Sequence, residues 1–148
     1  MKANQLKIMS TPNLTVQPYL NFNGRCEEAI EFYKSALGAE VQMLMRFKNN
    51  PEPPPGGVTP GTEEKVMHAS LRIGDTLVMA SDGGCKGDGK FKGISLSLLV
   101  HSKEEAEQRF AALAEAGDIH MPLTKTFFSP SFGIVVDRFG VCWMILMQ

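Results

Sequence analysis

The chain has 148 residues, of which 43% are hydrophobic, enough to build the core of one domain. Its 15 basic and 16 acidic side chains nearly cancel, and no run of Lys and Arg offers a binding surface for nucleic acid. No apolar stretch approaches the roughly 20 residues that span a bilayer, and the N-terminus lacks a signal-peptide pattern, so we expect neither nucleic acid nor a membrane as a partner.

The cysteines indicate a reducing compartment. Cys26, Cys85 and Cys142 are odd in number and far apart, and they form no C-x-x-C pair. This spacing argues against both a disulfide framework and a zinc knuckle. We therefore expect free thiols and a cytoplasmic location.

The N-terminal residues differ from the rest of the chain. Residues 1–14 show no sustained hydrophobic period, and we expect a flexible extension there. A single domain then covers residues 15–148. It divides into two similar modules, about 15–83 and 93–148.

The first module opens with a strand, predicted over residues 16–22, where apolar and polar residues alternate. Asn23-Gly24 then offers the N-cap of a helix with a 3.6-residue apolar period, and Gly38 supplies its left-handed end. A second strand follows, with apolar residues at the alternate positions Val41, Met43, Met45 and Phe47.

A long loop interrupts this module at residues 48–64. It holds five prolines and three glycines, which can sustain neither a strand ladder nor a helix. Two interpretations remain open, a functional lid and a disordered excursion. A β-hairpin of residues 66–73 and 76–81, turning at Gly74-Asp75, completes the module.

The second module repeats the same order. A strand over residues 94–100 precedes a helix that opens at Ser102, with Glu105 completing a capping box, and closes at Gly117. Three strands are predicted near residues 119–127, 132–136 and 141–147. The repeated order predicts an α+β fold of two βαβββ modules.

Several motifs carry a family resemblance. In the first module they are residues 17–24, Glu27-Glu28-Ala29, Phe32-Tyr33 and Leu37-Gly38; further along they are Met67-His68-Ala69, Ile73-Gly74-Asp75-Thr76 and Asp137-Arg138-Phe139-Gly140. Together they resemble the PhnB-like branch of the vicinal oxygen chelate superfamily over residues 16–147. The resemblance implies the glyoxalase/bleomycin resistance fold, in which paired curved mixed sheets surround a cavity, and a homodimer.

The superfamily includes metal-dependent members, and the resemblance implies where their ligands would lie. Four side chains from the first and fourth strands of each module face the cavity, here Gln17 or the adjacent Pro18, Met79, Ser95 and Met144. None is a strong ligand for a hard cation, because thioethers favour soft ions or line apolar pockets. We therefore expect no divalent metal centre of the usual kind; a metal, if bound, would use His68 with Gln17 and Ser95.

Strand parity predicts the lining of the cavity. Six residues should face the helices: Leu20, Phe22, Ala69, Leu71, Ile94 and Leu96. Their alternate neighbours then face the concave side, giving a ligand-binding set of Gln17, Tyr19, Asn21, His68, Ser70, Arg72, Met79, Ser95, Ser97 and Met144. This mixture of apolar and polar side chains suits a small oxygenated molecule held by a few hydrogen bonds.

His68 and Arg72 are the polar anchors of this set. His68 can act as a general base or a metal ligand, and a structural, hydrogen-bonded histidine is the alternative. Arg72 can pair with a carboxylate or phosphonate, and a solvent-directed side chain is the alternative. The aromatic residues 127–132 can form either a pocket wall or a subunit contact.

Two functions follow from this pattern. The first is a PhnB-like protein that binds a small oxygenated metabolite, with lyase or isomerase chemistry of the glyoxalase type left open. The second is a metal-free protein that sequesters a small ligand at a dimer cavity, as bleomycin-binding proteins do. Some PhnB-like family names carry a methyltransferase label, but no strand here ends in the Gly-rich turn into a helix that a nucleotide-like cofactor needs.

Overall fold

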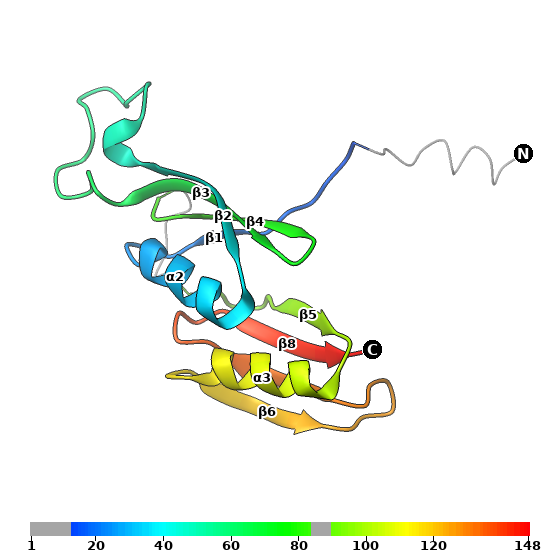
Figure 1. Ribbon diagram of the computed structural model, residues 1–148. Helices are drawn as coiled ribbons and strands as arrows, with labels where there is room; N and C mark the ends of the chain where they lie inside the picture. Colours follow the sequence, from blue (N-terminus) through cyan, green and yellow to red (C-terminus); the bar gives the residue numbers. More distant parts are fainter. Residues whose placement is uncertain (1–12, 84–89) are drawn as a thin grey trace, which may run out of the picture.

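A computed structural model describes residues 13–83 and 90–148 and shows two βαβββ modules (Figure 1). The predicted extension at residues 1–14 therefore falls almost wholly outside the described residues. The first module consists of β1 (Tyr19–Asn21), α2 (Cys26–Leu37), β2 (Glu40–Arg46), the short 3₁₀ helix η1 (Phe47–Asn49), β3 (Val66–Ile73) and β4 (Thr76–Ser81). The second consists of β5 (Leu96–Val100), α3 (Lys103–Ala114), β6 (Asp118–Thr124), β7 (Phe132–Val136) and β8 (Cys142–Met147).

Each module builds one four-stranded mixed sheet. The strand orders are β1-β4-β3-β2 in the first sheet and β5-β8-β7-β6 in the second. The first strand of each module pairs in parallel with the fourth, and the other neighbours are antiparallel. The predicted α+β fold class is thus confirmed.

The hairpin of the first module also agrees with the sequence. β3 and β4 meet at Gly74, whose φ of +58° a side chain rarely adopts, so glycine suits this turn position. The opening strands are shorter than predicted. Pairing starts at Tyr19 in β1 and at Leu96 in β5, and Val16 is 93% exposed.

Ile94 corrects one prediction of burial. It was expected to face a helix, but it precedes β5 and is 60% exposed. The predicted alternation holds only where a partner strand fixes which way a side chain points. Leu20, Phe22, Ala69 and Leu71 lie within or beside paired strands and are buried as predicted.

The N-terminus of α2 is capped differently from the prediction. The N-cap residue is Arg25, whose side chain makes no capping bond. Instead, the Asp82 carboxylate at the end of β4 accepts hydrogen bonds of 2.8 Å from the backbone N–H groups of Gly24 and Cys26. The C-terminus is as predicted, with Gly38 in the left-handed conformation.

The start of α3 agrees with the prediction, and its end does not. The hydroxyl of Ser102 accepts a 3.1 Å hydrogen bond from the Glu105 N–H, which confirms the predicted start. The helix ends at Ala114 rather than at the predicted Gly117, and Ala116 adopts the left-handed conformation at φ +59°. Gly117 is needed because a Cβ there would lie 2.3 Å from the carbonyl oxygen of Val136.

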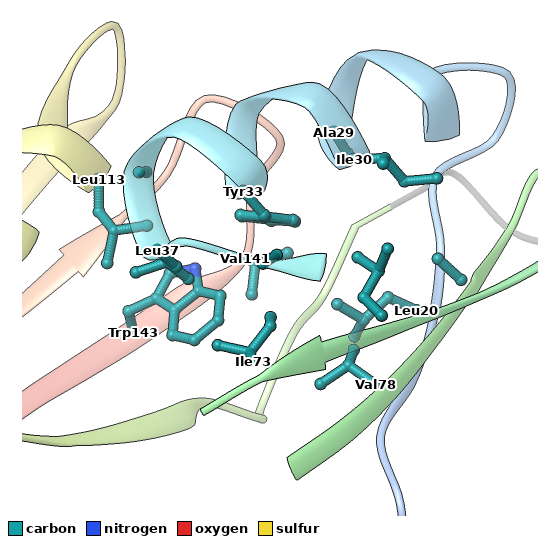
Figure 2. Close-up of a cluster of buried hydrophobic side chains, with 14 of the residues drawn as sticks. Leu20, Ala29, Ile30, Tyr33, Leu37, Ile73, Val78, Leu113, Val141 and Trp143 are labelled. Carbon is teal, nitrogen blue, oxygen red and sulfur yellow. The ribbon is translucent and has the colours of Figure 1, made fainter. Parts of the chain in front are cut away.

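One hydrophobic core joins the two modules around α2 (Figure 2). On one side, the helix packs above Leu20 and Val78 of its own sheet. On the other side, Tyr33 and Leu37 point toward Val141 and Trp143 of the second module. α2 packs on one face of the first sheet and α3 on one face of the second, and among the described residues no helix covers the opposite faces.

Candidate functional site

The open face of the first sheet carries most of the predicted ligand-binding residues. Paired positions run across the four strands in rows, because side chains at opposed positions share a face. One row is Tyr19, Met79, Ser70 and Met43. On the adjoining row of β3 and β2, His68 lies opposite Met45.

Tyr19 and His68 form a hydrogen-bonded pair on this face. The Tyr19 hydroxyl lies 2.9 Å from His68 Nδ1, and the ring centroids are 5.5 Å apart. With the proton on Nδ1, the imidazole donates to the hydroxyl and keeps a lone pair on Nε2. The hydrogen bond therefore orients the ring and leaves one nitrogen for a ligand or a proton.

Arg72 lies four residues beyond His68 on β3, on the same face. It is exposed, and within residues 13–83 and 90–148 it takes part in no ion pair. Its guanidinium is therefore available to an external anion.

Asn21 lies at the end of β1, and Gln17 lies just before its start. The Asn21 side-chain amide donates to the Gly83 carbonyl, and its oxygen accepts from the Asn23 N–H at 3.1 Å. Asn21 thus fixes the exit of the chain from β1. Gln17 is half-buried and precedes β1.

The remaining predicted residues belong to the second sheet. Ser97 and Met144 are paired positions on the face opposite α3, and Ser95 precedes β5. The four positions expected to hold metal in relatives are therefore split between two sheets. Gln17 and Met79 belong to the first module, and Ser95 and Met144 to the second.

The donor atoms at these positions do not fit a hard divalent ion. They are an amide, a hydroxyl and two thioethers, whereas such ions bind carboxylate and imidazole ligands. Among the described residues, no three His, Cys, Asp or Glu side chains gather in a group that could hold a metal. These positions therefore do not form a site for a hard divalent metal.

The two described thiols are poor nucleophiles. Burial, together with the negative charges of Asp82 and Glu27, raises the pKa of Cys26 to about 12. Burial also raises the pKa of Cys142. Both therefore stay protonated at neutral pH, where a nucleophilic cysteine needs its thiolate.

Three of the cavities among the described residues lie elsewhere. One of about 900 Å³ runs along α2 past Glu31 and Phe139, and one of about 440 Å³ lies beneath the loop at Pro54 and Val58. The third, about 260 Å³, separates the modules between Ile73 and Ser95–Leu98. None of these three is lined by His68, Arg72 or Met79. On the face with the polar anchors, Tyr19 and Arg72 are exposed, whereas His68, Ser70 and Met79 are half-buried.

Sequence reasoning missed Met43 and Met45 as members of this face. Their alternation predicted a strand, but their facing depends on the pairing of β2 with β3, including a register shift between Val41 and Met43. Pairing the predicted strands in the family's order would have revealed them.

The described helices are short. Within residues 13–83 and 90–148, none has the length and apolar character of a membrane span.

The chain also matches known proteins along nearly its whole length. The model of a family described as 3-demethylubiquinone-9 3-methyltransferase matches residues 14–146. Protein YjdN of Escherichia coli (strain K12) is 36% identical over 140 residues, covering 89% of this chain and 94% of YjdN.

Solved structures agree with this match. Protein PA1353 from Pseudomonas aeruginosa is 43% identical with a TM-score of 0.80, covering 92% of this chain and 98% of its own. A PhnB protein from Bacillus cereus is 30% identical with a TM-score of 0.76, covering 91% and 100%. A glyoxalase-related enzyme from Fulvimarina pelagi, at 16% identity and a TM-score of 0.59 over 92% and 88%, shares the fold. The chain therefore belongs to the family of this model, within the PhnB-like branch of the vicinal oxygen chelate superfamily.

Proposed function

We propose that this protein binds a small oxygenated metabolite carrying an acidic group on the open face of its first sheet. The observation that supports this most directly is the Tyr19–His68 hydrogen bond on the same face as the exposed Arg72. Arg72 would pair with the carboxylate or phosphonate of the ligand. His68 and Tyr19 would bind a second oxygen, and Ser70 and Met79 would line the site.

His68 would also be the residue that transforms the ligand, if the protein is an enzyme. An imidazole oriented through Nδ1 can take a proton at Nε2 from a carbon or oxygen of the ligand. Such proton transfer is the chemistry of a glyoxalase-like isomerase or lyase.

The second candidate function is a metal-free binding protein that sequesters its ligand. The half-buried thioethers of Met79 and Met144 favour it, since methionines adapt to ligands of varied shape. Both functions use the open face of the first sheet, to which the second function adds Met144 of the second sheet. They differ in whether His68 moves a proton.

Methyl transfer is not part of the proposal, although the family description names it. The turn from β1 into α2 contains one glycine, Gly24, and the N–H groups of Gly24 and Cys26 already donate to Asp82. That helix N-terminus is thus occupied by an anionic side chain of the protein itself.

We further propose that two copies form a homodimer and that each covers the open faces of the other. Arg72 and Met79 of one chain would then line a closed cavity. The described cysteines, Cys26 and Cys142, are unpaired, which supports the proposal of a reducing, cytoplasmic location.

Replacing Arg72 tests the binding function. Pyruvate, lactate and methylphosphonate would be titrated into the protein by calorimetry. We expect Arg72→Gln to weaken binding at least about tenfold, because one charge-assisted hydrogen-bond pair contributes about 1.5–3 kcal/mol. Arg25→Gln is the matched control, since Arg25 is an exposed arginine that pairs with Glu28 on α2.

Three outcomes test the proposed anchor and decide between the two candidate functions. Equal affinities for the wild type and Arg72→Gln would contradict the proposed anchor. If wild-type protein binds anions and turns over the hemithioacetal of methylglyoxal and glutathione, and His68→Gln abolishes only the turnover, the protein is an enzyme. Binding without turnover of this compound would favour the sequestering function.

A further inference from the structure

The open face of the first sheet also gathers soft donor atoms around His68. Met45 lies directly opposite His68 across the β2–β3 pair. Met79 lies on β4, opposite Ser70, which is one position along the same face of β3. His68, Met45 and Met79 are all half-buried.

Strand geometry brings these three side chains within reach of one another. The Cβ atoms of directly opposed residues lie about 5 Å apart, and those of diagonal neighbours about 7–8 Å. A methionine side chain has three rotatable bonds and can place its sulfur within that span. Two thioethers and one imidazole can therefore converge above β3.

The hydrogen bond to Tyr19 prepares His68 for such a role. It joins the Tyr19 hydroxyl to Nδ1 at 2.9 Å, so Nε2 is the ring nitrogen left over. Histidines that bind metals usually donate their other N–H to a fixed partner, which sets the tautomer and the ring orientation.

We propose that His68, Met45 and Met79 form a site for a soft monovalent cation, Cu(I) or its analogue Ag(I). Thioether sulfur and imidazole nitrogen select Cu(I), while the lack of carboxylates disfavours hard divalent ions. The site needs three neutral ligands and no residue from a second chain. It extends beyond the binding of an organic acid and does not depend on it.

Thiols are the main competitor for Cu(I), and the experiment has to remove them. The chain has three cysteines. Reactive thiols would be alkylated with N-ethylmaleimide before titration. Cys26 is fully buried with a raised pKa, so it would react slowly with the reagent and also with the metal.

The test is a competition titration of the alkylated, folded protein with Cu(I) against the chromophoric chelator bicinchoninate, under a reducing, oxygen-free atmosphere. We expect one equivalent to bind. Met45→Leu, Met79→Leu and His68→Gln should each weaken the affinity at least tenfold. Met147→Leu is the control, because Met147 lies on β8 and packs against the core. Methionine-to-leucine changes nearly conserve volume, so these variants should fold even if His68→Gln does not.

X-ray absorption of the one-to-one complex gives an independent readout. Two sulfur scatterers and one nitrogen are expected around copper. The proposal is overturned if alkylated protein retains no Cu(I), or if Met147→Leu weakens binding as much as Met45→Leu. A negative result here leaves the anion titrations of Arg72→Gln unaffected, since those contain no copper.

Discussion

Asp137 connects the two modules through one buried carboxylate. Its side chain is 3% exposed and accepts hydrogen bonds from the Tyr33 hydroxyl at 2.5 Å and from Trp143 Nε1 at 2.9 Å. The backbone N–H groups of Phe139 and Val141 donate to its other oxygen. Burial and the nearby Asp137 charge raise the pKa of Tyr33, so its phenol remains a donor at any physiological pH.

The sequence predicted half of this arrangement. The Asp-Arg-Phe-Gly motif identified a turn stabilised by its aspartate, because Asx turns depend on neighbouring residues. The bonds to Tyr33 and Trp143 could not be predicted from such a motif. Tyr33 is 104 positions away, and only the packing of α2 against the second module brings it there.

Removing the Tyr33 hydroxyl should destabilise the protein without unfolding it. Tyr33→Phe deletes one donor to a charged acceptor, and we expect about 1.5–3 kcal/mol less free energy of unfolding in urea. Tyr19→Phe is the matched control and should cost less than about 0.5 kcal/mol, since the Tyr19 side chain is half exposed. Equal losses for both variants would show that the bond to Asp137 contributes no special stability.

At the level of elements, the limits that neighbouring side chains set were predicted better than the limits that distant residues set. The start of α3 follows from Ser102 and Glu105, which act within one turn. The end of the same helix depends on the distant Val136 carbonyl, which excludes a side chain from Gly117. The first strands are likewise shortened by the positions at which β4 and β8 begin to pair with them.

Substitutions at two neighbouring residues, Gly117→Ala and Ala116→Gly, test the end of α3. Gly117→Ala places a methyl against backbone atoms that no rotamer change can move, and we expect a loss of about 2–3 kcal/mol in unfolding free energy. Ala116→Gly should instead stabilise the protein by about 0.5–1 kcal/mol, because Ala116 has a φ of +59°. Thermal and urea unfolding of both variants provides the measurement, and a neutral Gly117→Ala would contradict the close approach.

For the whole molecule, sequence parity predicted which residues share a face but not how the faces are used. His68, Ser70 and Arg72 do lie together, since β3 alternates regularly. The hydrogen bond between Tyr19 and His68 could not be predicted, because it depends on the register of β1 on β4, which no local pattern encodes. Each open face lies on the side of its sheet away from the helix of its own module, and the proposed second chain would cover it.

The second sheet gives a direct test of the proposed homodimer. Leu99 on its open face is 52% exposed and is paired with Leu146, beside Ile134 and Met144. A charge placed there would have to be buried on association, which is costly without a partner charge. We therefore expect Leu99→Lys to convert the dimer to monomer at micromolar concentration, as measured by light scattering after size-exclusion chromatography.

Ile119 provides a closely matched control for this experiment. It is 53% exposed and belongs to the outer strand β6, but it is paired with Val135, which faces α3. Ile119→Lys thus adds the same charge at the same exposure on the other side of the sheet, and the dimer should persist. A monomeric wild type, or dimers in both variants, would remove the support for a shared cavity. The ligand would then have to bind Arg72 and His68 on an open surface, where water competes strongly for each hydrogen bond.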